Sequence, residues 1–349
     1  MQEFSIQFQR AMIITERGGI DVKNLLREVE IRESVANHFV RGRVVVEDQN
    51  NIRERFINKG NEEFKIVWKS FEKSDPKDFH FYISNIRTVE TTEENETQQF
   101  AMELIDINFL KFLLKPAIQK DWVGKTKTQI FTDITRHHGV KMVPMTKNFE
   151  RIDYITNSLE ALKIIDDVLH YGNEPCYFYS GKTMTLTDKG SIFTNRGYKL
   201  TTDSLAQNGV RNAIKNFSMV DVIDRTEILQ DGINGYRHFS FYPFEDKYEL
   251  KDKKLGRTGK FELDPSLLNI DTVENCVHKT NELMMNFATF EMVYPETSME
   301  LCDTTELQVK NTEWEDEGFA EASGVYAIWE MTHRIDANYM YKQYITAVR

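Results

Sequence analysis

Hydrophobic and polar residues alternate along the first hundred positions of the chain, in short runs rich in Val, Ile and Phe. Runs of this kind between polar turns are typical of β-strands, because every second side chain of a strand faces the same side. The pattern predicts six strands, at 5–14, 28–34, 40–48, 63–70, 80–86 and 98–105. Short strands at near-regular spacing favour a barrel or a sandwich.

The hydrophobic period changes to that of helices after this strand-rich part. A short apolar segment predicts a helix at 108–115, and a second helix is expected from Thr126 to His138. Gly139 supplies a residue that can adopt the left-handed conformation common at helix ends. The sequence therefore predicts two consecutive helices here.

A third helix and a hairpin complete this middle part of the chain. The helix is expected to begin at Asn157 or Ser158 and to end before Gly172, with an apolar face formed by Leu159, Leu162, Ile165, Val168 and Leu169. The segment 176–188 predicts a hairpin that turns at Ser180 and Gly181. Helices and hairpin together indicate a small α+β unit.

Strands return in the last third of the chain, predicted at 214–224, 235–244, 289–294 and 305–311. Between them we expect an irregular charged stretch at 245–263. A helix is predicted at 271–287, with an apolar stripe formed by Val273, Val277, Leu283 and Met284.

The segment from Gly324 to the end predicts two strands that are apolar on both faces. Alternation places Val325, Ala327, Trp329 and Met331 on one side of the first strand, and Tyr326 and Ile328 on the other. After a turn at 336–338, it places Tyr339, Tyr341, Ile345 and Ala347 opposite Met340, Tyr344 and Val348. Both faces need cover, so we expect one to fill a core and the other to meet a neighbouring barrel or domain.

A weak internal similarity links the two strand-rich parts. Segments 64–70, 81–86 and 98–105 resemble 307–311, 325–331 and 340–348 in order and length, with a polar turn before the last segment of each set. Because all β-hairpins resemble one another, the pattern allows either a duplication or a coincidence.

The predicted fold class is α+β and mainly β, with two similar antiparallel β-barrel domains and a small α+β domain between them. The expected limits are 1–107 for the first barrel, 108–205 for the α+β domain and 206–349 for the second barrel. A peripheral insertion is expected at about 240–290.

Composition and charge exclude several classes of protein. The net charge of −11 is spread along the chain without a basic block, which argues against a reader of nucleic acids. The acidity serves either solubility or the repulsion of a polyanion. Three distant cysteines (Cys176, Cys276 and Cys302) suggest buried thiols in a reducing compartment. With no signal peptide and no apolar stretch near ~18 residues, we expect a soluble protein without a membrane span.

The motifs that could carry chemistry each favour a simpler interpretation. Gly-Lys pairs at 124–125, 181–182 and 259–260 lack the glycine that a phosphate loop needs five residues earlier. His137 and His138 diverge on a helix and so are expected at its end, beside the dipole, while His333 is expected to be an ordinary strand residue. Acidic turns at 88–95 and 314–318 leave a glycosidase possible without favouring it. We therefore predict no catalytic, cofactor-binding or metal-binding residues, no cofactor and no enzymatic activity.

Three segments carry a resemblance to a known family. Residues 26–52 resemble the first barrel strands of baseplate hub proteins of contractile-tailed bacteriophages, and residues 158–190 resemble their helix-plus-hairpin domain. The final strand pair is similar in having a tyrosine, a histidine near the turn and a returning aromatic residue, here Tyr326, His333 and Tyr344. The family is related to type VI secretion spikes and contractile bacteriocin hubs.

The resemblance implies a structural virion protein in the tail baseplate, assembled in the host cytoplasm. It implies a homotrimer with six barrels in a pseudo-sixfold ring, which joins a central trimeric spike to the hexameric tail tube or its initiator and anchors baseplate wedges. An acidic lumen would let DNA pass without specific binding. No spike segment follows Arg349, so we expect a separate spike protein. The alternatives are a tail-associated hydrolase of the cell envelope and a spike-type carrier of a secretion system.

Overall fold

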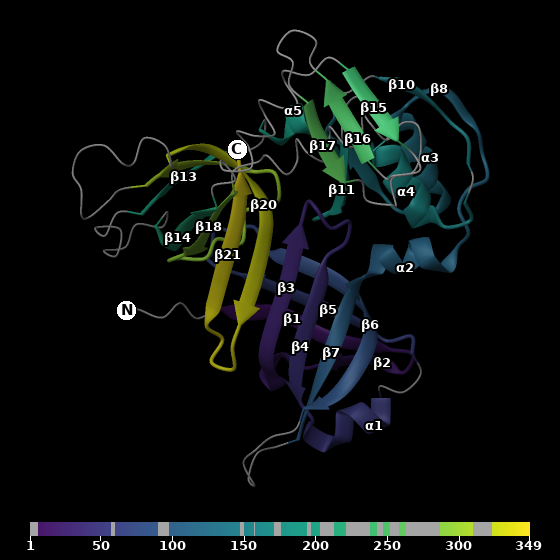
Figure 1. Cartoon of the computed structure of the whole chain (residues 1–349). Coiled ribbons are helices and arrows are strands. Elements are labelled where there is room, and N and C mark those ends of the chain that lie inside the picture. The colour runs from purple at the N-terminus through teal and green to yellow at the C-terminus, as the bar shows by residue number, and fades with distance from the viewer. Residues whose placement is uncertain are drawn as a thin grey trace.

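The protein is mainly β, and the helices α2 (Ile107–Leu114) to α5 (Lys189–Ile192) lie in the middle part of the chain (Figure 1). The computed structural model describes residues 6–56, 60–89, 98–146, 150–156, 158–170, 176–193, 197–202, 213–220, 238–242, 247–251, 258–262, 287–309 and 323–349. Among these residues, no helix is both long and apolar enough to span a membrane.

The first part of the chain forms an antiparallel sheet with the strand order β3-β4-β7-β6-β5-β1-β2. All six predicted strands are confirmed, and β2 is an addition that follows a turn at Glu16 and Arg17. The strands are β1 (Gln7–Thr15), β2 (Gly18–Asp21), β3 (Leu26–Ser34), β4 (Arg41–Glu47), β5 (Glu63–Lys69), β6 (Lys77–Val89) and β7 (Gln99–Asp106). The connections hold short helices, namely η1 (Lys23–Leu25), η2 (Gln49–Asn51) and α1 (Ile52–Phe56).

The middle part packs helices against two small sheets. Its elements are α2 (Ile107–Leu114), β8 (Trp122–Thr126), α3 (Lys127–His137), β9 (Met142–Pro144), β10 (Arg151–Tyr154), α4 (Ala161–His170), β11 (Cys176–Ser180), β12 (Met184–Asp188) and α5 (Lys189–Ile192). The first two predicted helices and the hairpin are confirmed. A capping box starts α3, in which Thr126 Oγ1 accepts from the Gln129 N–H at 3.3 Å.

The third predicted helix begins later than the sequence suggests. It starts at Ala161, and Leu159 precedes it with a relative exposure of 68% instead of joining its apolar face. Gln119 Nε2 donates to the Ser158 carbonyl at 3.0 Å, so this backbone group is used outside the helix. Asn157 and Gly172 lie outside the described residues.

The last part forms a second large set of strands and a separate three-stranded sheet. The former comprises β13 (Gly197–Thr201), β14 (Ile214–Val220), β18 (Phe287–Met292), β19 (Thr304–Gln308), β20 (Gly324–Ile335) and β21 (Tyr341–Val348). The separate sheet comprises β15 (His238–Tyr242), β16 (Lys247–Lys251) and β17 (Thr258–Glu262). The stretch 245–263 was expected to be irregular, which is wrong for β16 and β17, because their residues pair in a regular antiparallel ladder. Residues 271–286 of the predicted helix lie outside the described residues, and Phe287 begins β18.

The two large sets of strands share one strand order. The first runs β3-β4-β7-β6-β5-β1, and the second runs β14-β18-β21-β20-β19-β13, with corresponding strands in the same order along the chain. Both β6 and β20 carry a bulge at the same place in the ladder, at Ser84 and Trp329. One difference is that β1 runs antiparallel to β5, whereas β13 runs parallel to β19. The weak similarity in sequence therefore corresponds to a repeated strand arrangement.

The bulge at Trp329 corrects the expected faces of β20. Ile328 lies opposite Ala347 and Met331 lies opposite Ile345, so both inward residues of β20 face the same side although they are three positions apart. The extra residue shifts the alternation by one. Simple alternation predicts that Met331 shares a face with Ala327, but in the structure the two residues lie on opposite faces.

Both faces of β20 are covered by the chain itself around Ala327 and Ile328, which are fully buried. The Trp329 ring packs edge to face on Tyr177 of β11, with ring centroids 5.0 Å apart. Only the beginning of the strand departs from the expectation of cover, because Val325 is exposed. The apolar pattern thus reflects contacts between parts of this chain.

Candidate functional site

The two large sheets join along a single seam. Residues Glu330–Ile335 of β20 pair antiparallel with Val29–Ser34 of β3, and this pairing makes one continuous sheet of 13 strands. Figure 1 shows the yellow strand β20 beside the purple strand β3, with the helical part above them. Strands from opposite ends of the chain therefore hold the molecule together.

A cluster of polar side chains is buried at this seam, and we call it the seam cluster: Glu33, Lys77, His333 and Tyr341. Glu33 Oε1 accepts from Lys77 Nζ at 2.7 Å and contacts His333 Nε2 at 2.8 Å. His333 Nδ1 lies 2.7 Å from the Tyr341 hydroxyl. The side chains of Glu33 and His333 are 3% and 0% exposed. One carboxylate thus links strands β3, β6 and β20.

The protonation of the seam cluster follows from burial and from the partners. Burial alone would raise the pKa of Glu33, but the Lys77 ammonium and His333 outweigh it and lower the pKa to about 2. Burial lowers the pKa of His333, although the Glu33 carboxylate opposes this effect. A neutral His333 can donate from Nε2 to Glu33 and accept at Nδ1 from Tyr341. The cluster is therefore an ion pair extended by neutral hydrogen bonds.

The loop between β18 and β19 is hydrogen-bonded to both sheets on one side of the seam. The Ser70 N–H donates to Thr297 Oγ1 at 3.1 Å, and the Thr297 N–H donates to Ser70 Oγ at 2.9 Å. The Glu296 N–H donates to Gln343 Oε1 at 2.8 Å, and Gln343 Nε2 donates back to the Glu296 carbonyl at 3.2 Å. Two reciprocal pairs thus tie this loop to the first sheet and to β21.

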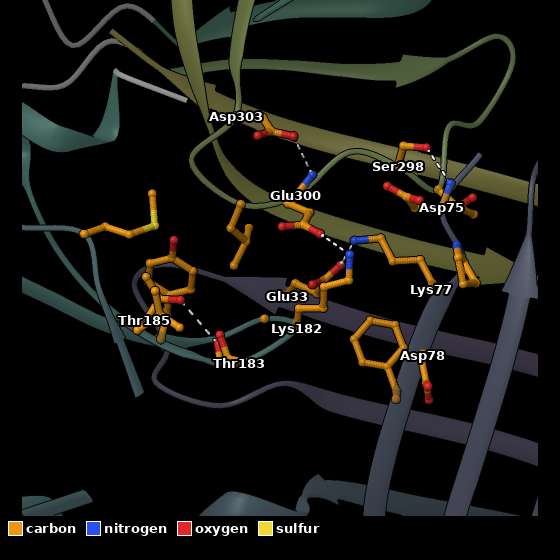
Figure 2. A pocket seen from close by; sticks show the side chains of 18 residues that line it. Glu33, Asp75, Lys77, Asp78, Lys182, Thr183, Thr185, Ser298, Glu300 and Asp303 are labelled. Carbon is orange, nitrogen blue, oxygen red and sulfur yellow. Dashed lines mark hydrogen bonds and ion pairs between the residues drawn. The ribbon is translucent and has the colours of Figure 1, made fainter. Parts of the chain in front are cut away.

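A cleft of about 470 Å³ opens beside the seam cluster, where all three parts of the chain meet. We call it the junction cleft, lined by residues of 75–79, 179–185 and 297–303, with Glu33 and Lys77 in its wall. Figure 2 shows Lys182 reaching across from the hairpin to Glu300, and the two side chains are 3.2 Å apart. Its charged lining is mostly acidic and comprises Glu33, Asp75, Asp78, Glu300 and Asp303 against Lys77 and Lys182.

The titratable groups at the junction cleft are better suited to structural contacts than to catalysis. Burial raises the pKa of Cys302 to about 12, and burial also raises the pKa of Tyr179 well above its usual value. A thiol of that kind stays protonated at neutral pH and is a poor nucleophile. Glu33, with its low pKa, is not a proton donor. Across the described part of the chain, no three His, Cys, Asp or Glu side chains could hold a metal ion.

Two residues of the first part of the chain, Asp106 and His38, make polar contacts with the helical part. Asp106 accepts from the Asn108 N–H at 2.6 Å, which caps α2, and its other oxygen accepts from the Ser180 hydroxyl. His38 contacts the Phe178 carbonyl through Nδ1 at 2.8 Å and Asp166 through Nε2 at 2.6 Å. Burial lowers the pKa of His38, but the Asp166 carboxylate outweighs it, and the net shift is upward.

Solved structures share this arrangement over nearly the whole chain. A tail protein from Neisseria meningitidis covers 97% of the chain and 96% of its own length, at a TM-score of 0.59 and 8% identity. A 43 kDa tail protein of prophage MuSo2 from Shewanella oneidensis covers 98% of both chains, at a TM-score of 0.56 and 10% identity. The chain has the fold of a phage tail protein.

This tail-protein fold also occurs in a secretion system. A type VI secretion component of Escherichia coli, described as structurally similar to tail proteins gp27 and gp5 of phage T4, matches 93% of the chain and 73% of its own length. The TM-score is 0.53 and the identity is 11%. No protein-family model and no curated protein matches the sequence. The three solved structures confirm the resemblance inferred from sequence at the level of fold.

The motif residues singled out in the sequence do not converge on one site. Gly124 lies in the middle of β8, the strand before α3, and Gly181 lies in the turn of the β11–β12 hairpin. The third Gly-Lys pair lies in β17 and not in the surface loop expected. His137 Nε2 contacts the Pro116 carbonyl at 3.1 Å. The acidic turns at 88–95 and 314–318 lie outside the described residues, apart from Thr88 and Val89 in β6.

His138 does not serve as a cation at the end of α3. Its ring is buried against Phe112, with ring centroids 4.9 Å apart, and Nδ1 lies 3.2 Å from the Lys111 carbonyl. Burial lowers its pKa, so the neutral form is favoured. His138 lies at the helix end as expected, as the C-cap residue of α3, but burial favours its neutral form over a cation beside the dipole.

Sequence reasoning missed the seam cluster, although the sequence contains a signal for it. Glu33 follows Val29 and Ile31 at the inward positions of β3, and these two apolar residues are fully buried. Lys77 and His333 stand at inward positions of β6 and β20 in the same way. Three charged or titratable residues at inward positions of three strands indicate a buried network.

Proposed function

We propose that the chain is a structural tail hub, a homotrimer in which each chain supplies two related β-barrel domains to a pseudo-sixfold ring. The ring would join a separate central spike to the tail tube or its initiator and would anchor baseplate wedges, in the virion tail baseplate. The domain limits 1–107, 108–205 and 206–349, with an insertion at about 240–290, belong to this proposal. We propose no cofactor and no enzymatic activity.

The repeated strand order is the observation that carries the proposal. A chain that contains the same six-stranded arrangement twice can present six similar units when three copies assemble. A bridge between Thr201 and Ala213 brings β13 back to the beginning of β14, which supports closure of the second unit into a barrel. The shared fold with two tail proteins over nearly the full length supports the location in a tail.

The exposed face around the seam supports a lumen that passes DNA without holding it. Arg32 pairs with Glu330 at 2.6 Å, and Arg334 pairs with Glu30 at 2.9 Å. Each arginine is thus beside a carboxylate, and the chain as a whole carries a net charge of −11. Phosphates are not attracted to arginines that are already neutralised. We propose that this face lines the lumen.

A spike-type component of a secretion system is the second candidate. The structural match to a type VI secretion component of Escherichia coli favours it specifically. The two candidates share a trimeric ring and differ in what the ring joins. A tail hub co-purifies with tube and wedge proteins of a virion, whereas a secretion component co-purifies with an effector or its adaptor.

Native mass spectrometry over a range of concentrations tests the ring directly. The proposal expects a dominant trimer of about 123 kDa, which is three chains of 41.0 kDa. Immunogold labelling of purified particles should then place the protein at the tail tip. A dimer, or labelling along the whole tail, would contradict the hub.

Enzymatic activity is tested separately by zymography on peptidoglycan. The proposal expects no clearing by the purified chain. Clearing that disappears on Asp78→Ala or Glu300→Ala, two carboxylates of the junction cleft, would favour the hydrolase instead.

A further inference from the structure

A strand edge that is paired in the second set of strands is open at the equivalent place in the first set. In the second set of strands, β20 is longer than its partner β19, and its second half, Glu330–Ile335, pairs with β3. In the first set, β6 is likewise longer than its partner β5, and that pairing ends at Tyr82. Beyond the bulge at Ser84, β6 pairs with β7 on one side, and no described strand pairs with its other side.

The register of the ladders makes the two edges comparable residue by residue. Counting from the bulges, Asn85 corresponds to Glu330, because Asn85 pairs with Glu103 and Glu330 pairs with Thr346 at the same step. Val89 then corresponds to Arg334. The open edge of β6 is therefore the equivalent of the edge that β3 occupies in the second set.

The equivalent of β3 also has an open edge. β14 pairs with β18 as β3 pairs with β4, and β14 is the last strand of the described sheet. Ser218 lies opposite Thr289 as Glu30 lies opposite Arg43, so Ser218 is the equivalent of Glu30. The bridge from Thr201 reaches Ala213, at the beginning of β14, and leaves the end near Ser218 open.

We propose that these two edges pair between neighbouring copies of the chain. The second half of β6 in one copy adds antiparallel to the end of β14 in the next, repeating between chains the pairing that β20 and β3 make within one. Within the chain, Arg334 lies opposite Glu30. Since Val89 corresponds to Arg334 and Ser218 corresponds to Glu30, Val89 lies opposite Ser218 between chains. The inference rests on the proposed trimer and supplies its interface.

The chemistry of strand edges supports a partner for both. An unpaired edge exposes backbone donors and acceptors that readily add another strand. On β6, the Ile86 N–H donates to the side chain of its neighbour Asn85 at 2.8 Å, and Arg87 and Thr88 are exposed. Two different edges that fit each other form a head-to-tail contact, which closes into a ring when the rotation between copies divides a full turn.

Disulfide trapping tests the register. The double variant Val89→Cys/Ser218→Cys places two thiols directly opposite each other between copies, within the span a disulfide allows. Under mild oxidation of the purified chain, we expect covalent dimers and trimers on non-reducing gels, with a ring of three as the largest product. The single variants Val89→Cys and Ser218→Cys control for other thiols.

A matched control uses the alternation of the strand. Thr88→Cys/Ser218→Cys shifts one thiol by one residue, to the other face of the sheet, so it should not form the bond. Equal cross-linking of both double variants, or none in a chain that is trimeric by native mass spectrometry, overturns the inference and leaves the proposed hub intact. A chain that is monomeric and does not cross-link overturns both. Covalent ladders beyond three chains retain the edge contact but contradict the closed ring of the proposed function.

Discussion

Two histidines at two junctions of this molecule shift their pKa in opposite directions. His333, in the seam between the two large sheets, is completely buried, and burial lowers its pKa. His38, between the first sheet and the helical part, is partly exposed, and Asp166 outweighs burial and raises its pKa. The comparison teaches that the seam relies on a permanent ion pair, whereas the helical attachment relies on a cation that a rise in pH removes.

Removing one charge of the seam cluster has the largest expected effect. Lys77→Met leaves the Glu33 carboxylate buried without its ammonium partner, and breaking a buried pair in this way costs about 3–5 kcal/mol. Chemical denaturation should show this loss of unfolding free energy. In the wild-type chain, this stabilisation is present above pH 4.5 and is lost as the pH falls toward the Glu33 pKa of about 2.

The matched double variant Glu33→Gln/Lys77→Met separates the pair from simple packing. Its amide can still accept from His333, and no unpaired charge remains, so we expect most of the lost stability to return. A double variant as unstable as Lys77→Met alone would mean that the lysine acts through packing of its side chain.

Removing the carboxyl group at the attachment of the helical part has a smaller expected effect. Asp106→Ala removes the cap of α2 and the acceptor for Ser180, which should cost about 1–3 kcal/mol. Hydrogen exchange should locate faster opening at α2 and β11. Asp106→Asn keeps one acceptor oxygen for the cap of α2, and its amide NH2 can donate to the Ser180 hydroxyl, so we expect a smaller loss than for alanine. A loss as large as that of alanine would assign the effect to charge.

The pH dependence of the two junctions should differ in sign. Because the folded pKa of His38 is raised, its contribution is present below pH 6.5 and is lost as the pH rises through the folded pKa. Because the folded pKa of His333 is lowered, its contribution is present above pH 6.5 and is lost as the pH falls. Hydrogen exchange near Phe178 should therefore speed up as the pH rises, after correction for the intrinsic rate.

His38→Gln is the control for this pH dependence. Glutamine can donate to only one of the two acceptors and does not titrate, so the exchange near Phe178 should lose its dependence on pH. A dependence that persists in His38→Gln would assign the titration to another group.

The sequence predicts strands well where one face is apolar, because alternation depends only on neighbouring residues. Six of the seven strands of the first sheet follow from it, and so does the final strand pair. It fails at Trp329, where an extra residue reverses the alternation, and at Leu159, where backbone contacts with Gln119 delay the helix. Pairing between β3 and β20 could not be predicted, because no local pattern tells which distant strand completes an edge.

The residues of the seam cluster could not be predicted as a site from the sequence, because only the fold brings them together. Glu33 and His333 are separated by 300 positions, and only the register of β3 with β20 brings them within 2.8 Å. Their inward positions in two strands indicated that both side chains are buried, but not that they contact each other. Chemistry that depends on distant pairing is visible only once the register is known.

The smallest expected effect concerns the exposed side of the same seam. Arg334 Nε lies 2.9 Å from Glu30, on the face opposite His333, and both side chains are more than a third exposed. An exposed pair contributes less than about 1 kcal/mol, so Arg334→Gln should barely change the unfolding free energy in denaturant. If the same change weakens the chain as much as Lys77→Met does, the stability of the seam lies in its exposed charges and not in the buried cluster. A near-neutral result, together with a large loss in Lys77→Met, would locate the stability of the seam in its buried side.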